Sequence, residues 1–299
     1  MLFSIIIPTY NRIEYLKATL DSVWQQTFQD FEVIVVDDGS TDGTAAYLSS
    51  LEGKVSLIQQ SNAGPGAARN RGAEAARGEY VVFLDSDDLW FPWTLELTAE
   101  IINSVGRPSF ISGRILPFSD PAELQHVSAQ PLQYRHHPDY LSAGSTLPFA
   151  GSCAMIVRRD TFMASGGFLQ GKVSAEDHDL ALRMGVAGGF VEIMAPTTVG
   201  YRRHTTNITG SLLAIVEGIM RLLQRESSGV YPGGNTHKKN RHQILGSHLR
   251  PVAIACAKAG LQSQGWELYR KSFLWHVTLL RLKFLFGFPL ISLRSMFTK

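Results

Sequence analysis

Residues 80–88 read YVVFLDSDD, an apolar run that ends in three carboxylates. A short run rich in β-branched and aromatic residues is typical of a buried strand. Asp85 and Asp87, at positions i and i+2 beyond the strand, can both reach one hard divalent cation, because Mg²⁺ takes carboxylate oxygens as ligands. A solvated turn or a helix cap is the alternative, but carboxylates clustered at the end of a buried strand are costly unless a cation neutralises them.

The same alternation of strand-like and helical segments runs through the first 110 residues. The strand-like runs are residues 3–7, 31–36, 55–58 and 79–84. Strands that alternate with helices predict βαβ units, so we expect an α/β fold with a mostly parallel sheet. Ligands of such sheets bind beyond the carboxyl ends of the strands. The polar clusters that follow three of these strands should therefore converge on one rim: Pro8-Thr9-Tyr10, Asp37-Asp38 and Asp85-Ser86-Asp87.

Two of these polar segments suit a nucleotide. Asp38 can accept hydrogen bonds from a ribose hydroxyl or a base, and a turn that leads into a helix cap is the alternative. Residues 62–71, NAGPGAARNR, place glycines and arginines at a helix start, which favours phosphate. The segment is neither a Walker loop nor a dinucleotide fingerprint, since no Gly-Lys-Ser/Thr follows and Arg69 replaces the third glycine.

Two further clusters carry ionisable groups that suit catalysis or metal binding. Residues 175–179, AEDHD, gather three carboxylates and a histidine at an expected helix start. The carboxylates either stabilise the helix dipole or supply a general base that takes a proton from a hydroxyl. Residues 201–204 read YRRH, where His204 can ligate a metal and Arg202 can touch a phosphate. A structural histidine is the alternative at that position.

Together these residues resemble the family 2 glycosyltransferases, which are inverting enzymes with the GT-A fold. The resemblance runs from Ser4 to about His204 and rests on five motifs in order: SIIIPTYNR, VVDDGSTDGT, NAGPGAARNRG, GEYVVFLDSDD and SAEDHDLALR. Each motif is moderately specific, and their shared order and spacing argue strongly against chance. The resemblance implies a Rossmann-like, mostly parallel sheet flanked by helices.

The resemblance also implies a role for individual positions. Tyr10 would lie near the nucleotide base, Asp38 would hydrogen-bond the base, and Arg69 would lie against the phosphates. Asp85 and Asp87 would form the family's Asp-X-Asp metal motif, with Asp87 the more direct ligand of Mn²⁺ or Mg²⁺. His204 would be a second metal ligand, and Asp177 would be the catalytic base. The positions that would bind the nucleotide are Pro8, Thr9, Tyr10, Asp38, Asn62, Arg69, Asp85 and Ser86.

The activity that the resemblance implies is inverting transfer of a sugar from a nucleotide-diphosphate donor to an acceptor hydroxyl. The expected donor is a UDP-sugar, because the family mostly uses UDP-sugars. The cation would neutralise the diphosphate leaving group. Because the acceptor displaces the diphosphate directly, no enzyme nucleophile is expected. The implied setting is the synthesis of a cell-surface polysaccharide or glycolipid, on a carbohydrate or lipid-linked acceptor.

Two other interpretations stay open at this point. A sugar-phosphate nucleotidyltransferase also combines such a sheet with metal-binding carboxylates, but it would carry a Gly-rich signature with Arg or Lys near its first strand, where residues 8–12 read PTYNR. The second is a catalytically inactive protein of the same fold that binds nucleotide sugars or acts as a scaffold. The presence of Asp87 and Asp177 argues against it.

Charge is distributed unevenly along the 299 residues. Residues 1–200 contain 13 Lys/Arg and 23 Asp/Glu, a net charge of −10, whereas residues 201–299 contain 15 Lys/Arg and 3 Asp/Glu, a net charge of +12. We expect a transferase domain over residues 1–205, divided near residue 110 into a nucleotide-binding half and an acceptor half. Residues 110–150, which are rich in proline, are expected to be loops and short elements that cover the sheet. A helical, basic region should occupy residues 206–299.

The end of the chain suggests a membrane surface. Residues 266–299 mix six Lys/Arg and one acidic residue with aromatic and aliphatic side chains, as an interfacial helix on an anionic leaflet does. A core helix with outward-pointing Lys and Arg stems is the alternative. No targeting segment and no apolar run of ~20 residues is recognised, so we expect a cytoplasmic protein with peripheral contact to the cytoplasmic membrane face. No motif suggests nucleic acid as a partner.

Overall fold

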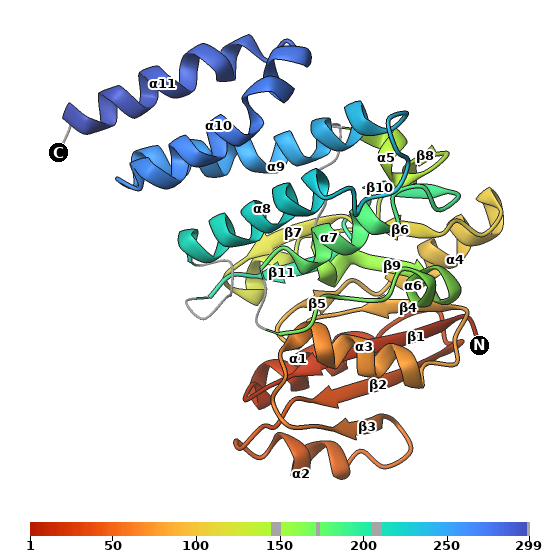
Figure 1. The fold of residues 1–299 in the computed structure, drawn as a ribbon. Coiled ribbons are helices and arrows are strands. Elements are labelled where there is room, and N and C mark those ends of the chain that lie inside the picture. The colour runs from red at the N-terminus through yellow and green to blue at the C-terminus, as the bar shows by residue number, and fades with distance from the viewer. Residues whose placement is uncertain (145–150, 172–173, 205–210, 298–299) are drawn as a thin grey trace. The chain divides into compact units, whose positions relative to one another are not determined.

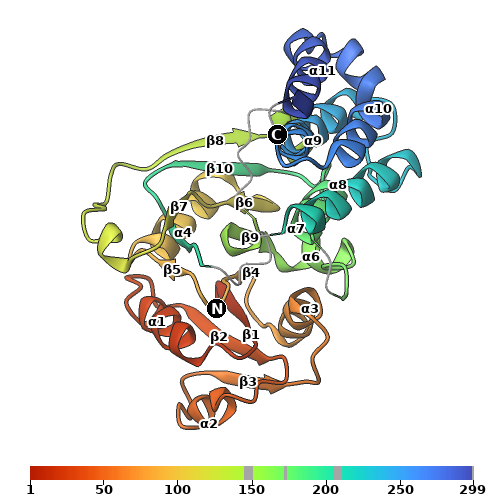
Figure 2. The ribbon, with the colours of Figure 1, turned by 90° about the vertical axis from the view of Figure 1, so that its left-hand side faces the viewer.

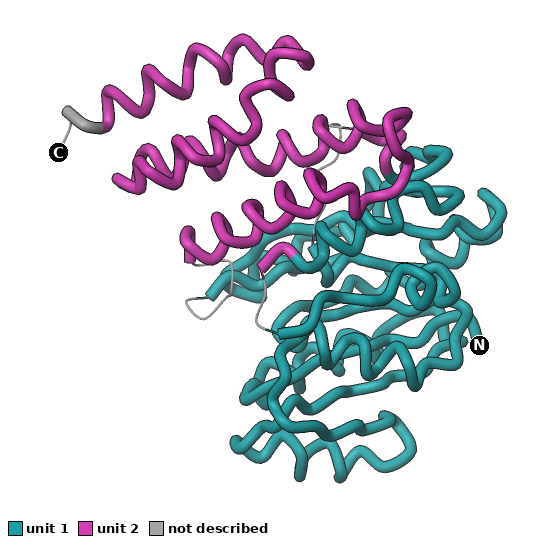
Figure 3. Tube along the Cα trace, viewed as in Figure 1, with its two compact units in different colours: residues 1–140, 148–172, 176–205 teal, residues 141–147, 173–175, 206–299 magenta. Residues whose placement is uncertain are grey.

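The computed structural model describes the chain except for residues 145–150, 172–173, 205–210 and 298–299 (Figure 1). The chain forms two compact units (Figure 3). The first unit comprises residues 1–140, 148–172 and 176–205, and the second comprises residues 141–147, 173–175 and 206–299.

The first unit is built on an eight-stranded sheet. The strand order is β3 (Ser56–Gln59), β2 (Phe31–Asp37), β1 (Phe3–Thr9), β4 (Tyr80–Phe83), β9 (Met155–Arg158), β6 (Phe110–Ser112), β10 (Phe190–Ala195) and β8 (Gln133–His137). The strands β3, β2, β1 and β4 are parallel to one another, and β10 is parallel to β6. The strand β9 is antiparallel to both β4 and β6, and β8 is antiparallel to β10. The predicted mostly parallel α/β sheet is therefore confirmed.

Helices cover both faces of this sheet. They are α1 (Ile13–Trp24), α2 (Thr44–Ser49), α3 (Pro65–Ala75), α4 (Thr94–Val105), α6 (Arg159–Ala164) and α7 (Glu176–Arg183), with the 3₁₀ turns η1 (Pro121–Leu124) and η3 (Ser152–Ala154). The short helix α5 (Tyr140–Ala143) lies mostly in the second unit. Figure 2 shows α1 and α3 on opposite faces of the parallel strands. Side chains alternate across a strand, so Ile5 and Ile7 join Leu20 of α1 in one core, while Ile6 packs at Gly72 of α3.

A smaller sheet of three strands completes the first unit. It has the order β5 (Leu89–Trp90), β11 (Val199–Arg202) and β7 (Ile115–Phe118). The strand β5 begins directly after Asp88, and β11 ends two residues before His204. The small sheet therefore ties the carboxylate-rich loop after β4 to the segment that carries the histidine.

The interpretation of residues 110–150 as a cover of the sheet is wrong for two segments. The strands β6 and β8 are members of the main sheet itself. The strand β6 has only three residues, and β8 is an edge strand whose residues 133–136 are exposed, so neither produces a long apolar signal. Residues 145–150 lie outside the described part of the chain.

The second unit is helical and contains α8 (Leu212–Ser227), α9 (Lys238–Lys258), α10 (Gln262–Thr278) and α11 (Leu282–Phe297). The helix α9 packs against α8, α10 and α11, and α10 also packs against α11. The predicted helical C-terminal region is confirmed. Among the described residues, no helix combines the length and the apolar character that a membrane span needs.

Candidate active site

The three polar clusters predicted at the strand ends are linked by direct contacts. In the parallel register Thr9 lies opposite Asp37, and the backbone N–H of Asp38 donates to the carbonyl of Thr9 at 2.9 Å. Arg12, just beyond the first cluster, forms an ion pair with Asp87. The ends of β1, β2 and β4 therefore form one rim, as the parallel topology requires.

Asp38 organises the loop that leads into α3. The carboxylate is buried and accepts hydrogen bonds from Gln60 Nε2 at 2.8 Å and from the backbone N–H groups of Ala63 and Gly64 at 2.8 and 2.9 Å. Gly39 follows in the left-handed region, with φ +85°, where a side chain would be strained. The carboxylate at the end of β2 therefore fixes the backbone of the loop that leads into α3.

The other positions predicted to bind nucleotide differ in exposure. Tyr10 is 46% exposed and Asn62 is exposed, so both side chains are available to a ligand. Pro8, Thr9 and Ser86 are buried. The Thr9 hydroxyl has no hydrogen-bond partner among the described residues, which leaves one polar atom unsatisfied below the rim.

Arg69 neutralises two carboxylates from distant parts of the sequence. The guanidinium is buried; it forms an ion pair with Asp85 and a second one with Glu176, in which Nη1 and Oε1 lie 3.2 Å apart. Burial lowers the pKa of Arg69, but the charges of Asp85 and Glu176 outweigh burial and raise the pKa above its usual value. Arg69 therefore joins the end of β4 to the start of α7.

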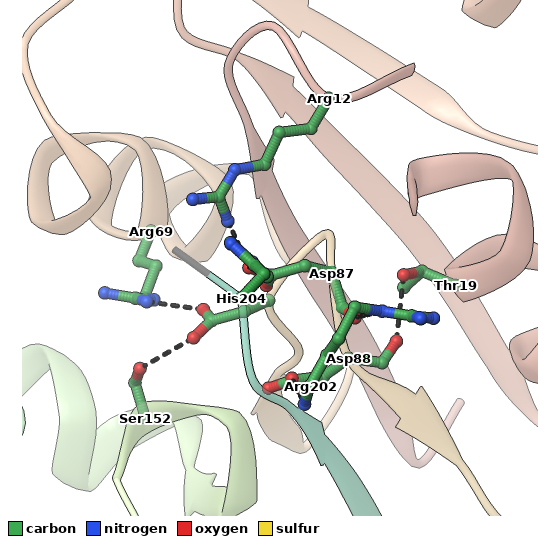
Figure 4. A network of polar contacts seen from close by, with 9 residues as sticks. Arg12, Thr19, Arg69, Asp87, Asp88, Ser152, Arg202 and His204 are labelled. Carbon is green, nitrogen blue, oxygen red and sulfur yellow. Dashed lines mark hydrogen bonds and ion pairs between the residues drawn. The ribbon is translucent and has the colours of Figure 1, made fainter. Parts of the chain in front are cut away.

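The carboxylates after β4 separate into two groups of potential ligand atoms. One oxygen of Asp85, one of Asp88 and the sulfur of Cys153 lie within 4.8 Å of one another. In the other group Asp87 Oδ2 lies 2.7 Å from His204 Nε2 (Figure 4). The sequence predicted Asp85, Asp87 and His204 as site residues and placed Asp88 in the same acidic run, but it gave no signal for Cys153, which approaches only through the fold.

The chemistry of the two groups favours different occupants. Burial, and then the charges of Asp88 and Asp85, raise the pKa of the Cys153 thiol well above its usual value, so the thiol stays protonated. Burial and the charges of Asp85 and Asp87 likewise raise the pKa of Asp88. A carboxylate and an imidazole suit Mn²⁺, whereas a protonated thiol does not, so the Asp87–His204 group fits such a cation better.

Arg202 and Tyr15 fix the position of the Asp87–His204 group. The backbone N–H of Arg202 donates to Asp88 Oδ1 and its Nε donates to the carbonyl of Asp87, both at 2.8 Å. Its guanidinium lies 5.0 Å from the ring of Tyr15 and 4.6 Å from that of Phe118. The His204 ring stacks on Tyr15 with centroids 5.2 Å apart. The arginine singled out as a phosphate ligand is thus buried against protein groups.

The start of α7 holds two adjacent carboxylates with very different pKa values. Burial and the charge of Asp177 raise the pKa of Glu176 to about 7, although Arg69 opposes this. Burial also raises the pKa of Asp177, but the charge and hydrogen bonds of His178 outweigh burial and lower it to about 2. Asp177 Oδ1 lies 2.7 Å from both the backbone nitrogen and the Nδ1 atom of His178. Neighbouring groups whose pKa values are driven apart are typical of an acid–base site.

Comparison with known proteins agrees with this fold. The family model described as glycosyl transferase family 2 matches residues 4–164, more than half of the chain. The mostly parallel sheet flanked by helices, together with this family match, gives the chain the GT-A type of fold. The chain belongs to glycosyl transferase family 2, a family of transferase enzymes.

Two relatives match part of the chain. An uncharacterized glycosyltransferase of Nostoc sp. is 42% identical over 108 residues, which cover 35% of this chain and 34% of that protein. One from Haemophilus influenzae is 29% identical over 192 residues, which cover 61% of this chain and 62% of that protein. The match therefore spans less than two thirds of the length of either relative.

Solved structures share the fold over nearly the whole chain. Residues 1–349 of S. aureus TarS in complex with UDP-GlcNAc align with a TM-score of 0.66 at 21% identity, over 98% of this chain and 90% of that chain. The Pyrobaculum calidifontis mannosyltransferase PcManGT, in complex with GDP-Man and Mn²⁺, aligns with a TM-score of 0.52 at 20% identity, over 97% and 86% of the two chains. At these identities the likeness concerns the fold alone.

Proposed function

We propose that the protein is an inverting glycosyltransferase that moves a sugar from a nucleotide-diphosphate donor to an acceptor hydroxyl with the help of a divalent cation. The observation that carries this proposal is the pairing of Asp87 Oδ2 with His204 Nε2 at 2.7 Å, on the rim where parallel sheets bind their ligands. The two residues are 117 positions apart in the sequence and combine ligand types that Mn²⁺ accepts.

Asp87 and His204 would hold the cation, which when bound neutralises the charge that develops on the leaving diphosphate. The exposed Tyr10 would lie against the base and Asn62 against the nucleotide. Asp38 and Thr9 would supply polar atoms below it, together with Pro8 and Ser86. Of the two similar structures with bound nucleotide sugars, TarS holds UDP-GlcNAc and PcManGT holds GDP-Man with Mn²⁺. We propose a UDP-sugar as the donor, with a GDP-sugar as the alternative.

Asp177 would act as the base. The acceptor oxygen forms a bond to the anomeric carbon while the bond from that carbon to the diphosphate oxygen breaks, and the hydroxyl proton passes to Asp177. Attack from the face opposite the diphosphate inverts the anomeric centre. His178, 2.7 Å from Asp177, would keep the carboxylate ionised and oriented before the transfer. The guanidinium of Arg69 would neutralise the carboxylates of Asp85 and Glu176 at the same rim, so its charge would not be available to the donor phosphates alone.

Glu176 is the alternative base, because its pKa of about 7 matches neutral pH more closely than that of Asp177. The ion pair with Arg69 argues against it, since the guanidinium occupies one carboxylate oxygen. The pH dependence of kcat/KM separates the two. With Asp177 as base, activity persists well below pH 6, whereas with Glu176 as base it halves near pH 7.

Release of nucleoside diphosphate from UDP- and GDP-sugars tests the activity directly. We expect one donor class to be hydrolysed slowly with Mn²⁺ and not with EDTA, and Asp87→Asn to abolish the release. Nucleotide binding without release from any donor would favour the inactive nucleotide-sugar-binding protein. The proposed acceptor is a carbohydrate or a lipid-linked sugar of a cell-surface polysaccharide or glycolipid pathway.

A further inference from the structure

Exposed apolar side chains are concentrated on α10 and α11. Of the fifteen large apolar residues exposed in the described part of the chain, eight lie between residues 273 and 293. Single exposed apolar residues are ordinary on a protein surface, whereas a contiguous group marks an interaction site. The most exposed members are Leu280 at 77%, Leu274 at 72%, Phe286 at 69% and Leu290 at 67%.

The exposed residues of α11 form a stripe along one side of the helix. Leu282, Phe286, Leu290 and Leu293 are spaced by four, four and three residues, which places them on one helical face. The other side of α11 packs within the second unit, where Phe288 is 1% exposed and stacks on Tyr269. Packing of a core helix explains the buried side of α11 but leaves the exposed stripe unexplained.

Cations border the stripe, and acidic residues are missing from this stretch of the sequence. Residues 270–294 contain five Lys/Arg and no Asp or Glu. Lys283 and Arg294 are exposed and directly follow Leu282 and Leu293 of the stripe. An apolar stripe beside cations is the pattern of a helix that lies in the interface of an anionic bilayer.

We propose that α10 and α11 form a peripheral binding surface for an anionic lipid bilayer. The stripe would enter the boundary between head groups and acyl chains, while the lysines and arginines remain at the phosphates. A second copy of the chain fits less well, because a two-fold dimer through this face would place the same cations against one another, and Glu267 is the one carboxylate in the sequence of α10 and α11. The surface does not depend on the proposed transfer activity, and it suits an acceptor that is itself held at a membrane.

Flotation of the full-length protein with vesicles tests the proposal. We expect binding to phosphatidylcholine vesicles that contain phosphatidylserine, weak binding to phosphatidylcholine alone, and a decrease with salt. Phe286→Ser and Leu290→Ser should each lower partitioning about tenfold or more, since each removes a large apolar side chain from the buried area. Lys283→Gln and Arg294→Gln should each lower partitioning about fivefold, because one cation near an anionic membrane surface contributes about 1 kcal/mol to binding.

Leu213→Ser is the matched control, because Leu213 is 49% exposed but lies on α8 of the same unit. It should leave partitioning unchanged, and thermal melts should show that all five variants stay folded. Absence of binding to anionic vesicles at low salt would overturn the proposal. So would equal binding by wild type and the stripe variants, or a dimer that Phe286→Ser dissociates while vesicle binding is absent. Nucleotide release measured without vesicles should be the same in every variant, which separates this proposal from that of the catalytic site.

Discussion

Two buried polar clusters, one in each unit, differ in their balance of charge. The first unit gathers five carboxylates at the rim, of which Asp87 pairs with Arg12 and both Asp85 and Glu176 pair with Arg69. The other two are Asp88 and Asp177. In the second unit Glu226 accepts from Arg241 Nε at 2.7 Å and lies 3.4 Å from His242 Nε2. Arg241 Nη1 donates to the carbonyls of Pro232 and Gly234. The first cluster therefore has more carboxylates than guanidinium groups, whereas in the second cluster the charge of Glu226 is balanced by that of Arg241.

The pKa shifts follow the same division. Burial raises the pKa of Glu226, but hydrogen bonds from His242 and Arg241 outweigh burial and lower it. Glu176 has a guanidinium partner as well, yet its pKa rises to about 7 because neighbouring carboxylates add to the effect of burial. A matched buried cluster is structural, whereas excess negative charge at a strand end is the setting that a cation and a nucleotide would neutralise.

The largest expected effect comes from removing the base of the first cluster. Asp177→Asn should lower kcat about 10²- to 10⁴-fold, because it cannot accept the hydroxyl proton, while donor KM stays nearly unchanged. Steady-state kinetics with saturating Mn²⁺ measures both constants. Glu176→Gln serves as the comparison and should cost much less; a larger loss in that variant would transfer the role of base to Glu176.

Substitutions in the second cluster should lower the stability of the fold and leave catalysis unchanged. Arg241→Met leaves Glu226 buried without its guanidinium, which should cost about 3–5 kcal/mol of unfolding free energy. Urea denaturation measures the loss, and kcat of the remaining folded protein should be that of wild type. If the double variant Arg241→Met/Glu226→Leu regains stability, the second cluster has a structural role. A fall in kcat of the folded Arg241→Met variant would contradict the assignment of catalysis to the first cluster alone.

A smaller effect should come from the ring beneath His204. Tyr15→Leu removes the stack that orients the imidazole, so affinity for Mn²⁺ should fall about 10- to 100-fold. Titration of nucleotide release with Mn²⁺ gives the half-saturating concentration. Tyr15→Phe keeps the ring and should behave as wild type; an equal loss in both variants would mean that the stack does not position the histidine.

The smallest expected effect is on stability against pH. The folded pKa of Glu176 lies above its usual value of 4.5, so its contribution to stability is fully present below that pH and is lost as pH rises through about 7. Unfolding free energy should therefore fall by about 1 kcal/mol between pH 6 and pH 7. Urea titrations at both pH values measure this difference, and Glu176→Gln should remove it. If the Glu176→Gln variant keeps the same dependence of unfolding free energy on pH as the wild type, Glu176 is not the source of that dependence.

Sequence patterns were sufficient for the parallel half of the sheet. Strands buried on both faces are continuous apolar runs, so residues 3–7 and 31–36 could be identified as β1 and β2 and their polar ends assigned to one rim. The strands β6 and β8 could not be identified, because one has three residues and the other lies at an exposed edge. Their place in the sheet depends on pairing with β9 and β10, which are distant in sequence.

The sequence proposed candidate site residues, and their roles stay predictions, but it could not supply the contacts between them. Motifs supplied Asp87, Asp177 and His204 because a resemblance assigns roles to positions. Tyr15 could not be assigned, since nothing local in the sequence indicates that a residue of α1 stacks under a histidine beyond β11. Arg202 was assigned to phosphate, and its contacts with Asp87 and Asp88 could not be foreseen. The pairing of Arg69 with Asp85 and Glu176 likewise requires the fold, because two of the three groups are more than 100 residues apart.

The most direct test of the account is a thermal-shift measurement with UDP, GDP, dTDP and CMP, each with Mn²⁺ and with EDTA. A ligand that binds only the folded state raises Tm, and at a concentration about 100 times Kd the shift should be about 5 °C. We expect one nucleoside diphosphate to raise Tm in the presence of Mn²⁺, and we expect EDTA or Asp87→Asn to abolish this shift. No shift with any nucleotide, or a shift that persists in EDTA and in Asp87→Asn, would contradict a cation-dependent donor site at this rim.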